Sequence, residues 1–282
     1  MAHLTVLREC ARRLADRAMP GRSPAMPGEP GSNHVLPADA YLYRAWRRII
    51  SSIPTECSLC QCTSRGGGLC QQCETDVLYS LRDASTSRCT VCALALNPDG
   101  SCPDCQARRP AFDRVIAAFD YDNPGDLLIQ RFKRGCFVDA PMLAGLLADA
   151  VRTAAPPLPR STILVPVPSS RAAIRRRGFN PAAEVARYLA RDLGLACKPS
   201  LLQRSREGVR QAYLPKRERM RGVEHLYCCP VSVPHADIAV VDDVITTGST
   251  LHAIAALLKR AGAATVYGLA LARTPRPPAR IE

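Results

Sequence analysis

Three features are missing from the sequence, and each absence excludes a class of protein. No apolar run approaches the roughly 18 residues that a transmembrane helix needs. The start has no apolar core of a secretory signal peptide, so we expect a cytoplasmic protein with no membrane insertion. The P-loop pattern G-x-x-x-x-G-K-[ST] occurs nowhere, which excludes an ATPase of that type.

Acidic residues are scarce relative to basic ones, and the imbalance is uneven along the chain. The 282 residues contain 38 Lys and Arg against 25 Asp and Glu, a formal charge of +13. Residues 109–282 hold 26 of the basic and 15 of the acidic residues. This excess favours an anionic partner, either a sugar phosphate or a nucleic acid, and charge alone does not separate the two.

Cysteine is abundant, and eight of the fourteen cysteines form a repeat. The pattern Cys-x₂-Cys-x₉-Cys-x₂-Cys occurs twice, offset by 32 residues, at Cys57, Cys60, Cys70 and Cys73 and at Cys89, Cys92, Cys102 and Cys105. In a cytoplasmic protein such cysteines are metal ligands rather than disulfides. Four thiolates match the tetrahedral set of a structural Zn²⁺, so we predict two zinc sites on hairpin-like ribbons. Spacing leaves ligand pairing within or between repeats open, and an iron–sulfur cluster or redox thiols are the alternatives.

One stretch of the basic part combines a buried strand, two carboxylates and a loop of small residues. Residues 238–241 are apolar and mostly β-branched, as in a strand covered on both faces of a parallel sheet. Asp242 and Asp243 follow at the carboxyl end of this strand. A turn is expected over residues 246–250 and a helix over residues 251–261. Open α/β sheets bind their ligands at this edge.

The chemistry of this loop suits a sugar phosphate. Loop amides and a helix N-terminus form an anion site, and a glycine lets the backbone approach the ligand. Ionised carboxylates accept hydrogen bonds from ribose hydroxyls, and Mg²⁺ held partly by substrate oxygens also fits. The candidate binding residues are Asp242, Asp243, Thr246, Thr247, Gly248, Ser249 and Thr250. The alternative is an acidic strand end that merely caps the next helix.

An eleven-residue motif spans this strand end and loop. Val-Val-Asp-Asp-Val-Ile-Thr-Thr-Gly-Ser-Thr, residues 240–250, resembles the phosphoribosyl-pyrophosphate (PRPP) motif of type I phosphoribosyltransferases. The resemblance implies that Asp242 and Asp243 hold the 2′- and 3′-hydroxyls of the ribose. It implies that the Thr-Thr-Gly-Ser-Thr loop holds the 5′-phosphate.

Strands and helices alternate after Pro110, which predicts a doubly wound parallel sheet. Strands are also expected over residues 115–119, 163–165 and 265–272, and helices over residues 126–133, 141–151 and 181–192. Residues 169–178 read as a loop with four arginines after a strand end, at the same sheet edge as the aspartates. Arginine forks suit phosphate oxygens, so pyrophosphate binding is predicted for Arg175, Arg176 and Arg177, with Lys133 as a further candidate. A solvated basic loop or a DNA-backbone contact is the alternative.

Further motifs extend the resemblance to the ComF/GntX family, over about residues 55–273. They are the paired cysteine turns, Ile-x-x-Phe-Lys, Val-Pro-Val-Pro, Arg-Gly-Phe-Asn and Gln-x-x-Leu-x₄-Arg from Gln211 to Arg219. The resemblance implies a small N-terminal double zinc ribbon joined to a type I phosphoribosyltransferase domain. Two positions depart from the family pattern, which has Gln where Pro181 stands and Asn where Gly222 stands. Each departure removes a polar side chain, which affects the second substrate more than PRPP.

These observations divide the chain into five parts. We expect a flexible extension over residues 1–40, a lead-in helix over 41–54, the double zinc ribbon over 55–108, the phosphoribosyltransferase-like domain over 109–274 and a tail over 275–282. The Arg-rich start resembles a mitochondrial transit peptide, but Glu9 and Asp16 argue against that. Residues 204–221, rich in Arg and Gln, suit a mobile flap that closes on a ligand.

The sequence supports functions from different classes. The first is Mg²⁺-dependent transfer of a phosphoribosyl group from PRPP, with pyrophosphate release and with Asp242, Asp243 and Arg177 as the catalytic residues. The second, implied by the family in naturally transformable bacteria, is an adaptor that binds single-stranded DNA and a DNA-uptake helicase. A PRPP-binding regulator without turnover is a third. The acceptor base and the oligomeric state do not follow from the sequence.

Overall fold

The computed structural model describes residue 49 and residues 52–82, 87–205 and 226–276. All of these residues belong to one compact unit, Asn33–Glu282. Several predictions concern residues outside the described ranges: the extension, most of the lead-in helix, most of the flap and the motif residues Gln211, Arg219 and Gly222. Within the described ranges no helix has the length and apolar character that crossing a membrane requires.

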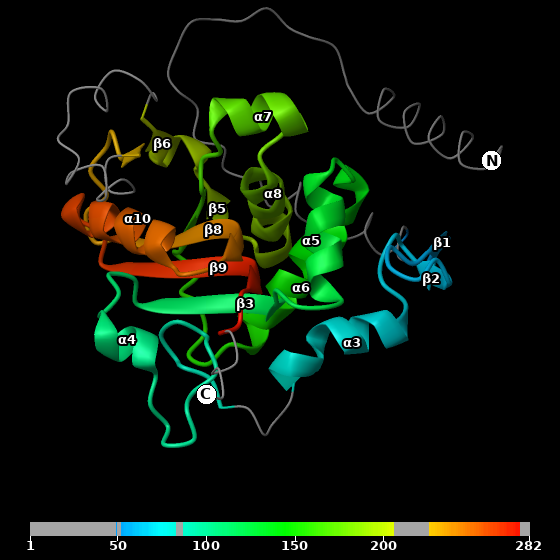
Figure 1. The fold of residues 1–282 in the computed structure, drawn as a ribbon. Helices are drawn as coiled ribbons and strands as arrows, with labels where there is room; N and C mark the ends of the chain where they lie inside the picture. Colours follow the sequence, from blue (N-terminus) through cyan, green and yellow to red (C-terminus); the bar gives the residue numbers. More distant parts are fainter. Residues whose placement is uncertain (1–48, 50–51, 83–86, 206–225, 277–282) are drawn as a thin grey trace, which may run out of the picture. The chain divides into compact units, whose positions relative to one another are not determined.

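A five-stranded sheet forms the centre of the fold (Figure 1). Its strands lie in the order β3-β9-β8-β4-β5, and every neighbouring pair is parallel. The strands are β3 Arg114–Asp120, β4 Ile163–Pro166, β5 Ala196–Cys197, β8 Asp237–Ile245 and β9 Thr265–Arg273. The central strands are nearly continuous apolar runs, as expected where both faces of a sheet are covered.

Helices cover both faces of this sheet. Three of them pack on one face: α5 Gly125–Lys133, α6 Ala140–Thr153 and α8 Pro181–Leu193. The helix α10 Ser249–Arg260 packs on the other face. Side chains along β8 alternate between the two faces of the sheet. Ala239 and Val241 lie in the core on the first face, and Ile238 and Val240 lie in the core on the second. The predicted doubly wound α/β class is confirmed.

The two cysteine repeats pack against opposite faces of the sheet. The first repeat carries the hairpin of β1 Pro54–Glu56 and β2 Thr63–Arg65 and then α3 Gln71–Arg82, whose Val77 joins the core beneath α6. The second repeat contains α4 Pro103–Ala107. Its Cys92 and Cys102 are buried in the α10 core together with Phe112 and Val115. The second repeat is therefore part of the core of the sheet domain.

Short elements complete the described fold. The 3₁₀ turns η1 and η2 span Phe137–Asp139 and Pro199–Leu201. The helix α7 spans Arg171–Arg177. The strands β6 Gln203–Arg204 and β7 Tyr227–Cys228 form a separate antiparallel ladder.

The structure corrects the loop that was predicted over residues 169–178. The helix α7 lies there, and both of its ends are well capped. Ser170 Oγ accepts a hydrogen bond from the Ala173 N–H at 3.1 Å, and Gly178 ends the helix with φ 83°. Alanine and arginine are good helix formers, so a short capped helix is more stable here than an open loop.

The boundaries of β8 and α10 also differ from the prediction. β8 continues through the two aspartates to Ile245, because Asp242 still pairs with Ala270 of β9. The following helix begins at Ser249 rather than at residue 251. The two carboxylates therefore lie on a regular strand, which fixes their directions more firmly than a turn would.

Gly125 at the start of α5 lies against the end of β3. A methyl group at this position would be 2.7 Å from Cδ2 of Phe119 and 2.9 Å from the backbone oxygen of Asp120. We expect Gly125→Ala to lower the free energy of unfolding by about 2 kcal/mol, because overpacking a core costs roughly 1–3 kcal/mol. Urea denaturation measures this. Gly100→Asn, at an open position with φ 77°, is the control and should stay near the wild type; an unchanged Gly125→Ala midpoint would contradict the expectation.

Candidate functional site

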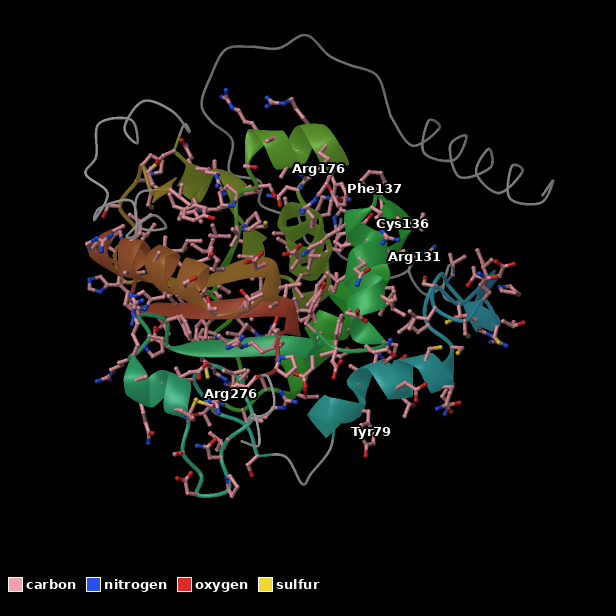
Figure 2. All side chains as sticks on the ribbon, in the orientation of Figure 1. Tyr79, Arg131, Cys136, Phe137, Arg176 and Arg276 are labelled. Carbon is pink, nitrogen blue, oxygen red and sulfur yellow. The ribbon has the colours of Figure 1, made fainter. Side chains whose placement is uncertain are left out.

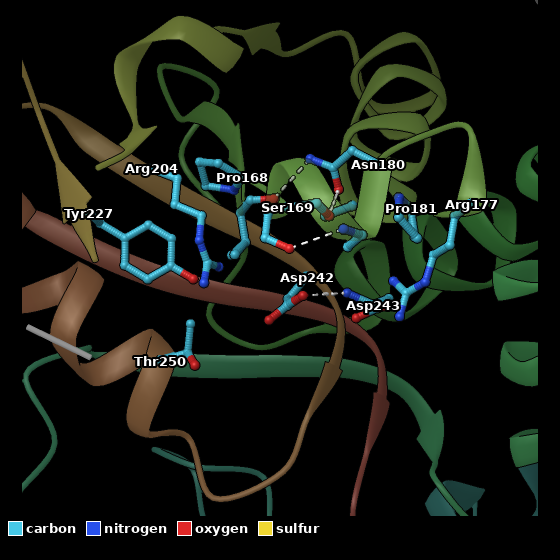
Figure 3. Close-up of a pocket in the computed structure, with 14 residues that line it drawn as sticks. Pro168, Ser169, Arg177, Asn180, Pro181, Arg204, Tyr227, Asp242, Asp243 and Thr250 are labelled. Carbon is cyan, nitrogen blue, oxygen red and sulfur yellow. Dashed lines mark hydrogen bonds between the residues drawn. The ribbon is translucent and has the colours of Figure 1, made fainter. Parts of the chain in front are cut away.

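A cavity of about 250 Å³ lies at the carboxyl ends of β4 and β8 (Figure 3). Its walls come from the chain after β4, from the end of β8 with the start of α10, and from the β6–β7 ladder. The lining residues with polar or charged side chains are Ser169, Ser170, Arg177, Asn180, Arg204, Tyr227, Asp242, Asp243 and Thr250. This is the edge at which open α/β sheets bind ligands.

Asp242 and Asp243 form one wall of the cavity and are held by their own strand. Asp242 Oδ1 accepts a hydrogen bond from the Asp243 N–H at 2.9 Å, and Asp243 Oδ1 accepts one from the Val244 N–H at 2.9 Å. Asp243 Oδ2 also lies 3.0 Å from Nζ of Lys133, the last residue of α5. The side chains of the two aspartates also interact with each other. Both line the cavity, so a ligand there can reach them.

The charge of Asp242 is poorly stabilised in the free protein. Burial raises the pKa of this carboxyl well above its usual range, and the negative charge of Asp243 raises it further. The positive charge of Lys133 acts in the opposite direction. A ligand that brings hydrogen-bond donors or a cation to Asp242 would relieve this cost. A perturbed carboxyl in a cavity is accordingly a candidate binding group.

We expect Asp242→Asn to gain stability relative to the wild type as pH rises. A raised pKa in the folded state means that the folded chain binds this proton more tightly than the unfolded chain, whose value is about 3.9. The stabilising contribution is complete below about pH 4 and is lost as pH rises through the raised value. Urea denaturation between pH 4 and pH 8 measures the difference. The control is Asp149→Asn, which removes an exposed carboxylate on α6. A stability difference between Asp242→Asn and the wild type that does not change with pH would contradict the expectation.

Residues 246–250 form the turn between β8 and α10, here called the 246–250 turn. Gly248 has φ 75°, a conformation that glycine adopts without strain, and it directly precedes α10. Thr247 Oγ1 lies 3.0 Å from Ser249 Oγ and accepts a hydrogen bond from the Ser249 N–H at 3.3 Å. Thr250 lines the cavity. The first amides of α10 lack intrahelical acceptors, so the turn is suited to an anion.

Asn180 organises the opposite wall. Its Nδ2 donates to the Val167 carbonyl at 3.0 Å, and its Oδ1 accepts from Ser169 Oγ at 2.9 Å. Asn180 occupies the N-cap position of α8, but its side chain makes no capping hydrogen bond. Pro181 follows and lines the cavity itself, and Arg177 reaches the cavity from the end of α7 (Figure 3).

Arg204 and Tyr227 form the third wall. Arg204 is the first residue of the predicted flap, but sequence reasoning did not place Tyr227 in the site. They face each other across the β6–β7 ladder, with the guanidinium carbon 5.8 Å from the ring centroid. Burial raises the pKa of Tyr227, so its hydroxyl remains a neutral hydrogen-bond donor at physiological pH. No local sequence signal identifies this pair, because the two strands meet only in the folded chain.

The structure brings most of the predicted site residues together. Asp242, Asp243, Arg177 and Thr250 line the cavity, Lys133 pairs with Asp243, and Thr246, Thr247, Gly248 and Ser249 form the adjoining turn. Arg175 and Arg176 are exposed on α7 and do not line it; Figure 2 shows Arg176 on that helix. Successive helical residues point about 100° apart, so three consecutive arginines cannot face one cavity.

The eight predicted metal ligands gather into two groups of four. The first cysteine group is Cys57, Cys60, Cys70 and Cys73, and the second cysteine group is Cys89, Cys92, Cys102 and Cys105. Within each group all sulfur atoms lie within 4.8 Å of one another, so the ligands pair within each repeat. Cys60 and Cys70 are 3.6 Å apart, and Cys92 and Cys102 are 3.5 Å apart. A tetrahedron with metal–sulfur bonds of about 2.3 Å has edges of about 3.8 Å, so both groups fit a metal.

Comparison with known proteins identifies the family of this chain. The chain is 33% identical over 231 residues to the DNA utilization protein YhgH of Salmonella typhi, and the match covers 79% of this chain and 99% of that protein. The chain belongs to the ComF/GntX family. The family predicted from the sequence motifs is thus confirmed, although no protein-family model matches the chain.

Two further ComF/GntX relatives carry competence names. Competence protein F of Haemophilus influenzae is 31% identical over 215 residues, covering 73% of this chain and 90% of that protein. Competence protein ComFC of Bacillus subtilis is 28% identical over 218 residues, covering 73% of this chain and 84% of that protein.

Two solved structures have a low likeness to this chain. A hypoxanthine phosphoribosyltransferase from Staphylococcus aureus aligns with a TM-score of 0.31 and 14% identity, over 56% of this chain and 70% of that one. The allosteric regulatory enzyme of purine biosynthesis aligns with a TM-score of 0.32 and 21% identity, over 47% of this chain and 25% of that one. Nothing about chemistry follows from these values, and the fold rests on the strand order described above.

Proposed function

We propose that this ComF/GntX protein binds PRPP in the cavity and, with Mg²⁺, transfers its phosphoribosyl group to a nucleophile with release of pyrophosphate. The observation that carries the proposal is the arrangement of two opposite walls of the cavity. Asp242 and Asp243 with the 246–250 turn lie on one side of a cavity of about 250 Å³. Arg177, Ser169 and Ser170 lie on the other. One ligand with a ribose, a phosphate and a pyrophosphate can occupy both walls.

Each part of PRPP has a matching group in the cavity. The carboxylates of Asp242 and Asp243 accept hydrogen bonds from the ribose hydroxyls. The amides of the 246–250 turn and the start of α10 bind the 5′-phosphate. Arg177 and the nearby serine hydroxyls bind the pyrophosphate. This placement leaves Arg175 and Arg176 outside the contact with substrate.

In the reaction the bond from ribose C1 to the pyrophosphate oxygen breaks, and a bond from C1 to the nucleophile forms. Positive charge develops on the sugar, and the two carboxylates would stabilise it. Arg177 stabilises the negative charge that collects on the departing pyrophosphate. Carboxylate oxygens are the ligands that Mg²⁺ prefers, so Asp242 and Asp243 would be the residues that hold it. When bound, Mg²⁺ offsets the charge of the pyrophosphate oxygens.

Calorimetric titration of metal-loaded protein tests this proposal. Mg²⁺–PRPP should bind at micromolar concentration, and at least tenfold more tightly than ribose 5-phosphate or pyrophosphate, because only PRPP contacts both walls. Failure of PRPP to bind well-folded protein would overturn the proposal. A coupled assay for pyrophosphate release with a panel of bases then measures turnover. Binding without release from any base would identify a PRPP-binding regulator instead.

We also infer that both cysteine groups hold structural Zn²⁺. Four thiolates leave no coordination position for a substrate, and Zn²⁺ favours such closed tetrahedral sites. Elemental analysis of the purified protein should give two zinc ions per chain and no iron. Visible absorption from iron–sulfur charge transfer would contradict this assignment.

A nucleic-acid adaptor is the second candidate. The matched relatives are named DNA utilization and competence proteins, and α7 exposes Arg171, Arg175 and Arg176 outside the cavity. Such a protein would work in the cytoplasm, with the exposed surface of residues 55–108 docking a helicase and the domain of residues 109–274 binding the strand. Affinity for a labelled single-stranded oligonucleotide should then fall steeply with salt. Weak binding that PRPP displaces would favour the transferase.

A further inference from the structure

Arg273 is a buried cation that joins three segments of the chain. It is the last residue of β9, and only 2% of it is exposed. Its Nε donates to the Cys92 carbonyl at 2.9 Å. Its Nη1 donates to the Ile245 carbonyl at 2.9 Å and also to the Thr246 carbonyl. Burial lowers the pKa of this guanidinium, and an ion in such a place remains stable only while its acceptors stay in position.

Two of these acceptors begin the turn that would bind the 5′-phosphate. Ile245 ends β8, and Thr246 is the first residue of the 246–250 turn. A further hydrogen bond, from the Thr274 N–H to the Ile245 carbonyl at 3.0 Å, ties the same point to the end of β9. The guanidinium therefore fixes the start of the turn through its backbone and leaves the turn side chains available to a ligand.

The third acceptor belongs to a metal ligand. Cys92 is a member of the second cysteine group, and its backbone lies on the turn from residue 89 to residue 92. That turn is anchored to the sheet at two more points. Arg88 donates to both carboxylate oxygens of Asp120 at the end of β3, at 2.9 and 2.6 Å, and the Val115 N–H donates to the Val91 carbonyl at 2.8 Å. The position of the Cys92 carbonyl therefore depends both on the metal site and on these contacts with the sheet.

The first cysteine group is connected differently. Ser58 Oγ donates to Asp139 Oδ1 at 2.9 Å, and Arg131 Nε donates to Asp139 Oδ2 at 2.9 Å. Asp139 is buried, and Arg131 lies on α5 (Figure 2). This network links the first cysteine group to α5 and makes no contact with the 246–250 turn among the described residues. The two groups thus differ in what their loss would disturb.

We propose that Arg273 is a positioning residue that makes the order of the 246–250 turn depend on a metal in the second cysteine group. A divalent ion held by four thiolates fixes the Cys89–Cys92 turn and adds negative charge near the buried guanidinium. Without that metal the turn keeps its contacts with Asp120 and Val115 but loses the anchor of the four thiolates, so the Cys92 carbonyl is less firmly held as an acceptor for Arg273. The turn then loses part of its backbone support. The coupling stands on these contacts; its relevance to PRPP rests on the proposed function.

Hydrogen exchange over the 246–250 turn and the first turn of α10, read by mass spectrometry, tests the coupling in the full chain, because the amides of Ser249 and His252 are hydrogen-bonded there. Arg273→Met removes the guanidinium and keeps a long apolar side chain. We expect at least tenfold faster exchange in this turn, with the zinc content unchanged. Arg273→Lys keeps the charge but cannot reach the Cys92 and Ile245 carbonyls at once, so it should restore exchange only in part. Should Arg273→Met fail to fold, the lysine variant carries the test.

Matched controls separate this coupling from general damage. Arg276→Met is the control for Arg273→Met (Figure 2). Arg276 Nη2 lies 3.3 Å from Cys102 Sγ, so this arginine contacts the same cysteine group but not the turn. Its exchange in the turn should match the wild type. Cys105→Ser in the second group should accelerate exchange in the turn, and Cys60→Ser in the first group should not. Adding Cys105→Ser to Arg273→Met should cause little further acceleration.

Two results would overturn the proposal. One is wild-type exchange in the 246–250 turn of folded Arg273→Met protein. The other is an equal acceleration by Cys105→Ser with and without Arg273, which would mean that the metal site and the guanidinium act independently. Calorimetry with Mg²⁺–PRPP on the same variants is read separately. If the wild type binds no PRPP while the exchange pattern holds, the proposed function fails and the coupling stands.

Discussion

A double Asp242→Asn and Asp243→Asn variant should lose PRPP affinity by at least about 100-fold. Each substitution replaces an ionised acceptor by a neutral amide of the same shape, and a hydrogen bond to a charged group contributes about 1.5–3 kcal/mol. Two such losses exceed the roughly 2.7 kcal/mol that a 100-fold change requires. Asparagine keeps the packing at the end of β8, so the fold should persist. Calorimetric titration with Mg²⁺–PRPP gives the affinity.

The control for this variant is Asp149→Asn, which removes an exposed carboxylate on α6 that is 2.7 Å from Arg152 and far from the cavity lining. It should bind PRPP as the wild type does. The zinc content and the unfolding curve of all three proteins show whether they are equally folded. Binding by the double variant within threefold of the wild type would mean that the ribose is held elsewhere.

Loss of the buried ligand Cys102 in the second cysteine group should destabilise the sheet domain far more than loss of the exposed ligand Cys60 in the first. Cys102 is buried in the core between α10 and the sheet, whereas Cys60 is exposed. Metal binding to a structural zinc site contributes about 10 kcal/mol or more of folding free energy in small domains. We therefore expect Cys102→Ser to lower the free energy of global unfolding by several kcal/mol. Cys60→Ser should melt the first ribbon and leave the main transition near its wild-type midpoint.

Thermal unfolding followed by circular dichroism, together with zinc analysis, measures this difference. Cys62→Ser is the matched control, because Cys62 is exposed and belongs to neither group of ligands. It should retain two zinc ions and the wild-type midpoint. Equal losses from Cys60→Ser and Cys102→Ser would show that the two ligands support the fold to the same extent, contrary to their different burial.

Local signals explain what could be predicted from the sequence. Three of these signals are neighbours along the chain: the β-branched run before Asp242, the glycine of the 246–250 turn and the apolar stripe of α10. Such local patterns predict a strand, a turn and a helix without a structure. The repeat of Cys-x₂-Cys turns is local in the same sense. Even within these segments the boundaries moved by a few residues, because pairing with β9 extends β8 to Ile245.

The remainder depended on contacts between distant segments. Arg204 and Tyr227 line the cavity because β6 and β7 pair. The residue pattern of neither strand predicts this pairing. Asn180 occupies the N-cap position of α8, yet its side chain bonds to Val167 and Ser169 and shapes the wall. Arg273 ends an ordinary apolar strand, and its connection to Cys92 spans most of the domain in sequence. Such residues are found only once the fold is known.

The strand order has a consequence for the growing chain during synthesis. β3 is made well before β8 and β9, and these two strands separate it from β4 in the finished sheet. A nascent chain that ends before Thr265 therefore holds β3 and β4 without the strand that joins them through the centre of the sheet. Its unpaired strand edges and uncovered apolar faces are the features that promote aggregation. Ribosome stalling late in the message should thus yield a product that depends on chaperones or is degraded.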